Sequence, residues 1–151
     1  MKDEFSELLE TAMYKEVASQ AFYIAAQQKT DDPGAKELMK ELADQELRHL
    51  RMLEAMRQRD WKSGQWRREV VSDLRISEYL VEVDKLEDSS LQDTLVFAMK
   101  REQHAVEFYS RMMSALRSED AKLLCERLVH EELKHKYRLE LLYDSLFLRE
   151  D

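Results

Sequence analysis

The chain has 151 residues, of which 44% are hydrophobic and 37% are charged, and it contains only two glycines and one proline. Because β-rich folds need many turns, this scarcity of glycine and proline excludes them and predicts long amphipathic helices. The formal net charge of −8 argues against nucleic acid or an anionic membrane as a partner.

The sequence also lacks the marks of a membrane or secreted protein. No apolar run approaches the length of a membrane span, and the first five residues carry acid where a signal peptide would carry base. Cys125 is the only cysteine, which excludes an internal disulfide, and its position on an apolar seam indicates a core residue. We therefore expect a cytoplasmic protein without membrane contact.

Apolar residues recur at helical spacing in four stretches of what we interpret as a single domain, 1–151. They predict helices over about residues 3–29, 34–59, 90–116 and 119–148. The clearest break precedes the second helix, where Asp32 suits an N-cap and Pro33 the first helical position. Ser118 is the expected cap of the last helix. Residues 60–89 are less regular, with one short helix expected over 76–83.

The two halves of the chain match each other at an offset of 86 residues. Identical residues recur at this offset in Met13 and Met99, Glu16 and Glu102, Phe22 and Phe108, Tyr23 and Tyr109, Leu42 and Leu128, Glu46 and Glu132, and His49 and His135. Such a repeat predicts two similar helical hairpins packed around a pseudo-twofold axis.

The glutamates of each hairpin lie at one level. Glu16 and Glu46 are 30 residues apart, and their midpoint falls in the break between the first two helices. Glu102 and Glu132 have the same separation, with their midpoint in the break before the last helix. Residues equidistant from the turn of an antiparallel hairpin sit at equal height, so each hairpin brings its two glutamates together.

These positions fall on the inner, apolar seams of the predicted bundle. A single Glu-x-x-His is typical of a solvated helix pair, but two copies on core faces with partner glutamates favour a metal site. Four buried carboxylates are unfavourable without compensation, and no lysine or arginine occupies the inner positions. Two divalent cations would balance their charge, and oxygen-rich ligation suits iron or manganese. The predicted ligands are Glu16, Glu46, His49, Glu102, Glu132 and His135.

Other polar residues near these seams have two interpretations each. Tyr23 and Tyr109 each lie two turns after a ligand glutamate. They are either core residues or hydrogen-bond donors to a ligand carboxylate. Gln45 and Glu131 each directly precede a ligand glutamate and could orient a histidine. For both, we favour a position on a solvated helix face. Two further histidines fall off the inner faces and are expected at the surface: His104 and His130.

At these residues the sequence resembles the rubrerythrin branch of the ferritin-like superfamily, over the four helices. The resemblance implies an all-α, ferritin-like four-helix bundle in which residues 60–89 form a long crossover between two hairpins. It also implies that Glu46 and Glu132 bridge two metal ions. Terminal ligands would be Glu16, His49, Glu102 and His135, with the pairing of each histidine with a glutamate left open.

The chain departs from many rubrerythrins in two respects. It has no four-cysteine rubredoxin domain, and Ala105 stands where a second glutamate is expected, which leaves a more symmetric site, similar to that of bacterioferritin.

The expected function is reduction of peroxide or dioxygen, or oxidation of ferrous iron, at two iron ions, with manganese or zinc as alternatives. The residues expected to act are Glu46 and Glu132, with Tyr23 and Tyr109 in support. A separate electron donor protein is the expected partner, and the chain could form a homodimer. The alternative is a non-catalytic iron-binding or metal-stabilised bundle.

Overall fold

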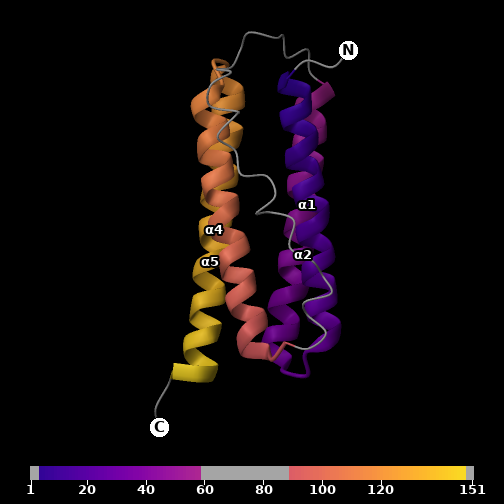
Figure 1. Ribbon diagram of the computed structural model, residues 1–151, viewed down its shortest axis with the longest axis vertical. Helices are drawn as coiled ribbons and strands as arrows, with labels where there is room; N and C mark the ends of the chain where they lie inside the picture. The colour runs from indigo at the N-terminus through magenta and orange to yellow at the C-terminus, as the bar shows by residue number, and fades with distance from the viewer. Residues whose placement is uncertain (1–3, 59–88, 149–151) are drawn as a thin grey trace.

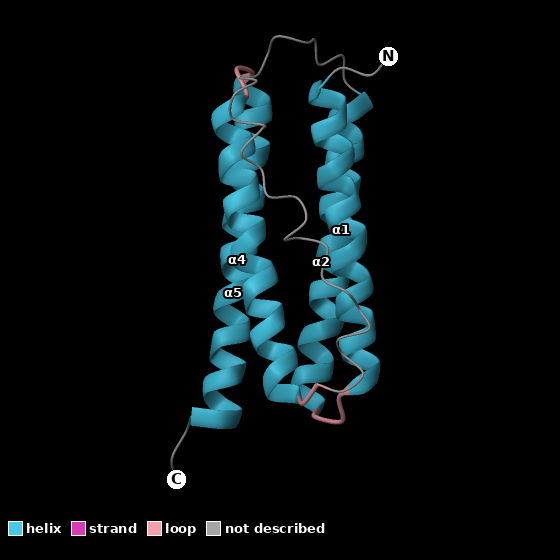
Figure 2. Ribbon diagram, in the orientation of Figure 1, coloured by secondary structure: helices cyan, strands magenta, loops and turns pink. Residues whose placement is uncertain are grey.

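The computed structural model describes residues 4–58 and 89–148, and these form four long helices and one short turn of helix. The elements are α1 (Glu4–Lys29), α2 (Pro33–Gln58), α4 (Leu91–Ala115), α5 (Glu119–Tyr143) and η3 (Asp144–Leu148). No β-strand occurs in the described residues (Figure 2). The predicted helices are confirmed, whereas the short helix expected over 76–83 and nearly all of the crossover lie outside the described residues.

The last helix differs from the prediction at its end. The α-helical pattern stops at Tyr143, and η3 continues to Leu148 as a π-helix. The N–H of Asp144 is shared between the carbonyls of Glu140 and Leu141. Because no residue of η3 is buried, core packing does not hold this segment to α-helical geometry.

Side-chain caps explain where three of the helices begin. Asp32 Oδ2 accepts a hydrogen bond of 2.8 Å from the N–H of Ala35, which confirms the predicted N-cap before Pro33. Ser90 Oγ accepts from the N–H of Asp93 at the start of α4. Ser118 Oγ accepts from Ala121 at 3.4 Å at the start of α5, also as predicted.

The helices are arranged as two antiparallel hairpins, α1 with α2 and α4 with α5, which lie side by side along the bundle (Figure 1). Helices α2 and α4 run in the same direction, so a tight turn cannot join the two hairpins. This is the two-hairpin bundle that the sequence predicted. Among the described helices, none combines the length and the apolar character needed to cross a membrane.

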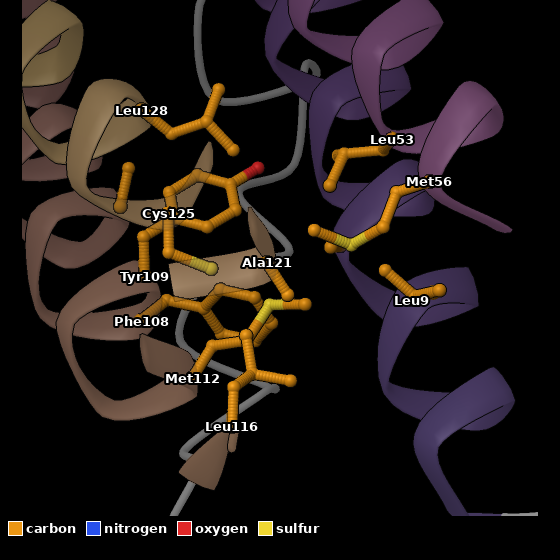
Figure 3. Packing of buried hydrophobic residues seen from close by; sticks show 12 residues of the cluster. Leu9, Leu53, Met56, Phe108, Tyr109, Met112, Leu116, Ala121, Cys125 and Leu128 are labelled. Atoms are coloured by element: carbon orange, nitrogen blue, oxygen red, sulfur yellow. The ribbon is translucent and has the colours of Figure 1, made fainter. Parts of the chain in front are cut away.

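In the part of the chain that the structure describes, the core consists of two apolar clusters, one toward each end of the bundle. The first core cluster, drawn in Figure 3, includes Leu9, Leu53, Met56, Phe108, Met112, Cys125 and Leu128. The second includes Phe22, Met39, Leu42, Leu95, Ala98 and Leu139. Along α5 the seam passes from Leu128 to Leu139 through Glu132 and His135, which are buried as well. A polar layer therefore separates the two clusters.

Candidate metal centre

The polar layer contains four carboxyl and two imidazole side chains, contributed by all four long helices. Each of the six is at most 2% exposed, and they are Glu16 of α1, Glu46 and His49 of α2, Glu102 of α4, and Glu132 and His135 of α5. The structure thus brings together every side chain that the sequence predicted as a metal ligand.

One part of the layer centres on His49. Its Nδ1 lies 2.8 Å from Glu132 Oε1, 3.7 Å from Glu16 Oε2 and 3.8 Å from Glu46 Oε2. Each of these four residues offers one ligand atom within 4.8 Å of the others. We call Glu16, Glu46, His49 and Glu132 the His49 group.

The other part centres on His135, whose Nδ1 lies 3.3 Å from Glu46 Oε1, 3.5 Å from Glu102 Oε2 and 3.9 Å from Glu132 Oε1. These four residues form the His135 group, which meets the same 4.8 Å criterion. Glu46 and Glu132 belong to both groups. The two imidazole rings stack with their centroids 5.7 Å apart. The sequence left open which glutamate accompanies each histidine, and in the structure Glu16 lies with His49.

Seven atoms that face the middle of this layer make no hydrogen bond of good geometry in the described residues, although several of them lie close to one another. They are Oε2 of Glu16, both Oε atoms of Glu46, Oε2 of Glu102, Oε1 of Glu132, and Nδ1 of His49 and His135. Leaving one buried polar atom unpaired costs about 1–3 kcal/mol, so this concentration is unfavourable unless protons or metal cations lie among these atoms. All are oxygen or nitrogen donors of the kind that iron, manganese and zinc bind. The residues present therefore fit a pair of metal ions.

In the metal-free protein the four carboxyls divide into two kinds. Burial, and then the charge of Glu46, raises the pKa of Glu16 to about 8. Burial and the neighbouring Glu132 raise the pKa of Glu102 well above its usual range. Burial also opposes ionisation of Glu46 and Glu132, but polar contacts with the other carboxyls and the imidazoles lower the pKa of both. The raised pKa values favour the protonated forms of Glu16 and Glu102, and the lowered ones favour the ionised forms of Glu46 and Glu132.

The imidazoles carry the compensating charge. Burial acts to lower the pKa of His135, but contacts with Glu102 and Glu46 raise it to about 10. The pKa of His49 is raised further, against the same effect of burial, by Glu132, Glu16 and Glu46. Without metal, the protonated forms of both imidazoles are therefore favoured opposite the ionised forms of Glu46 and Glu132, so that protons take the place of cations in the layer.

Each of the two tyrosines donates a hydrogen bond to a carboxyl on the opposite hairpin. Tyr23 of α1 donates to Glu102 Oε1, and Tyr109 of α4 donates to Glu16 Oε1. Both hydroxyls are buried, and burial followed by the charge of the accepting glutamate raises their pKa well above 10. Of the two interpretations left open, the structure has the tyrosines as donors, each fixing one oxygen of a glutamate whose other oxygen faces the layer.

Gln45 and Glu131 are not simply residues of a solvated face, as the sequence favoured. Gln45 Oε1 contacts Nε2 of His135, and Glu131 Oε2 lies 3.6 Å from Nε2 of His49. Both are half-buried, because a long side chain on the outer edge of the seam reaches across to the facing helix. The Nε2 atoms thus face acceptors while the Nδ1 atoms face the carboxyls.

Two cationic side chains of the described residues are buried beside the polar layer, although the sequence led us to expect no lysine or arginine at the inner positions to pair with the carboxylates. Lys15 is 4% exposed, with Nζ 3.8 Å from Glu16 Oε1, and nearby carboxylates overcome the effect of burial to raise its pKa. Arg101 is equally buried and donates to Ser19 Oγ at 2.9 Å. Lys15 and Arg101 occupy equivalent positions of the 86-residue repeat, each directly before a candidate ligand. This equivalence was the only signal in the sequence that could have indicated their burial. Their long apolar stems let them enter the core from the flank of the seam.

Cys125 and His130 lie where the sequence predicted, whereas His104 is less exposed than the expected surface position. His130 is exposed, and His104 is only partly buried and belongs to neither group. Cys125 packs in the first core cluster, where burial raises the pKa of its thiol to about 12.

Solved structures with a similar fold support the assignment of the bundle. One is a hypothetical protein from Pyrococcus furiosus, with a TM-score of 0.70 and 24% identity over 92% of this chain and 87% of that one. Another is a two-domain protein from Anabaena variabilis containing DJ-1/ThiJ/PfpI-like and ferritin-like domains, with a TM-score of 0.74 and 18% identity over 96% of this chain and 40% of that one. Such identities show the fold alone, which is ferritin-like.

No curated protein sequence matches the chain. The family profile described as rubrerythrin, however, matches residues 7–143, a range that includes both hairpins and all six residues of the polar layer. Dimetal sites are usual in this family, in agreement with the buried carboxyl and imidazole cluster. The chain belongs to the rubrerythrin family.

Proposed function

We propose that the polar layer binds two iron ions and that the protein uses them for redox chemistry on peroxide, dioxygen or ferrous iron. One observation carries the proposal: the unpaired buried donor atoms form two groups that share Glu46 and Glu132. A shared pair of carboxylates between two sets of terminal ligands is the arrangement of carboxylate-bridged dimetal bundles.

The distances support a role for each residue. Oε1 of Glu46 faces His135 and its Oε2 faces His49, as a carboxylate bridging two ions would require. Glu132 Oε1 lies 2.8 Å from His49 Nδ1 and 3.9 Å from His135 Nδ1, so Glu132 would be the second carboxylate shared by the two ions. Glu16 with His49 would be terminal ligands of one ion, and Glu102 with His135 of the other.

Iron suits the donor set better than a thiophilic metal, since no sulfur atom belongs to either group. Bound iron would supply the one-electron steps that these side chains cannot perform. The chain's own contribution is to hold the carboxylates in place, through the hydroxyls of Tyr23 and Tyr109. Because all six candidate ligands are buried, only small molecules are suitable substrates, and electrons would come from a separate protein donor or from ferrous iron.

The same burial would also suit a metal that only stabilises the bundle, which is the competing function. Anaerobic loading with ferrous iron, elemental analysis, and then addition of peroxide or dioxygen with an excess of reductant distinguishes the two. Repeated turnover, followed by absorption spectroscopy, supports the redox enzyme. Binding of about two ions without turnover supports the stabilising role, and binding of only trace metal contradicts both.

A further inference from the structure

The outer nitrogens of the two histidines meet chemically different side chains. His135 Nε2 contacts the amide oxygen of Gln45, whereas His49 Nε2 faces the carboxylate of Glu131 at 3.6 Å. Gln45 and Glu131 occupy equivalent positions in the 86-residue repeat. The two halves of an otherwise symmetric site therefore differ by a neutral amide on one side and a carboxylate on the other.

The distance between His49 Nε2 and Glu131 Oε2 is only slightly longer than that of a hydrogen bond. Neither His49 Nε2 nor Glu131 Oε2 has a hydrogen-bond partner in the described residues, and a gap of 3.6 Å leaves no room for a bridging water. Arg127 Nε lies 3.5 Å from the same oxygen, but its side chain is 70% exposed and exposed ion pairs are weak. A small shift of Glu131 therefore suffices for it to accept the Nε2–H of His49.

A carboxylate behind a ligating imidazole fixes its tautomer and makes the inner nitrogen a stronger donor to a metal ion than a neutral amide does. We infer that Glu131 is a positioning residue that makes the His49 group the tighter of the two metal positions; this rests on the proposed dimetal centre. Lys15 and Arg101 stand at equivalent positions in the two halves but differ in their contacts, because Lys15 Nζ lies 3.8 Å from Glu16 Oε1 and Arg101 donates to Ser19 Oγ. Substitution of Glu131 removes neither contact, so its effect is separate from theirs.

The test follows the order in which the two positions fill. Cobalt(II) is added without oxygen to the metal-free full chain, and hyperfine-shifted proton NMR spectra are recorded at one equivalent. Two bound ions repel each other, so the second ion binds more weakly whichever position fills first. The position that the first ion occupies is therefore more informative than the difference between the first and second binding affinities. Glu16→Ala and Glu102→Ala each remove one terminal ligand and provide reference spectra for the two positions.

In the unmodified chain the first ion should occupy the His49 group. Glu131→Gln should lower the preference of the first ion for the His49 group over the His135 group by about tenfold. This is the lower end of the usual effect on metal affinity of removing a hydrogen-bond partner of a ligand. Adding Gln45→Glu to that variant should shift the preference further, toward the His135 group. Glu126→Gln removes the same charge from the same surface depression and should leave the order unchanged.

Equal effects of Glu131→Gln and Glu126→Gln, or first occupancy of the His135 group in the unmodified chain, would overturn the inference. Thermal melts of the metal-free variants identify any that fail to fold. If the unmodified chain does not bind two ions, the proposed function fails. If it binds two and their order does not respond to Glu131→Gln, only the inference fails.

Discussion

Loading the metal-free protein with two divalent cations at pH 7 should release about four protons, because metal ligands must be deprotonated. Glu16 and Glu102 hold one proton each, since their pKa values are raised to about 8 and well above the usual range. His49 and His135 each hold a second ring proton, the pKa of His135 being about 10. Four protons leave as two divalent cations bind, so the charge of the layer stays the same.

The number of protons should depend on pH in a defined way. With a pKa of about 8, Glu16 is roughly 90% protonated at pH 7 and roughly 10% at pH 9. His135, with a pKa of about 10, keeps most of its proton over the same interval. The titration of Glu16 should therefore lower the number of protons released by about one between pH 7 and pH 9.

Calorimetric titration with cobalt(II), without oxygen and in buffers of different ionisation enthalpy, measures the number of protons released. The matched control is Glu16→Gln, which should release about one proton fewer at pH 7 and lose most of the change up to pH 9. Release of two protons or fewer by the unmodified chain at pH 7 would refute the reasoning, because the layer would then hold too few protons to be neutral without metal.

Three further outcomes are expected. Tyr109→Phe leaves Glu16 Oε1 without its donor and should destabilise the metal-free protein by about 1–3 kcal/mol in urea unfolding, whereas an unchanged midpoint would show that the hydroxyl contributes nothing. Glu46→Ala should reduce iron occupancy, by elemental analysis, far more than His130→Ala, and equal losses would contradict the assignment of ligands. Thermal melts of the metal-free protein should show higher stability at pH 6.5 than at pH 7.5. Groups with raised folded-state pKa values, such as Glu16 and Glu102, stabilise below their unfolded pKa and lose this effect as pH rises through the folded value. The gain is about 1.4 kcal/mol per pH unit for each extra proton that the folded state holds, and no gain would mean that the carboxyls are not crowded.

The sequence alone determined the helical class, the two hairpins and the level at which the glutamates meet. Helical spacing fixes which side chains of one helix share a face, and the turn directly before Pro33 fixes the relative height of Glu16 and Glu46. Neither property depends on how the two hairpins are packed together. That the six residues bind metal stays a prediction, as does the single domain over the whole chain.

Only the tertiary structure decided what crosses between the hairpins. The hydrogen bond from Tyr23 to Glu102 and the contact of Gln45 with His135 join residues 79 and 90 positions apart. They depend on the rotation and separation of packed helices, which a repeat in the sequence does not specify. The burial of Lys15 has the same origin, because a residue at the flank of a seam is exposed or buried according to how closely the neighbouring helix approaches.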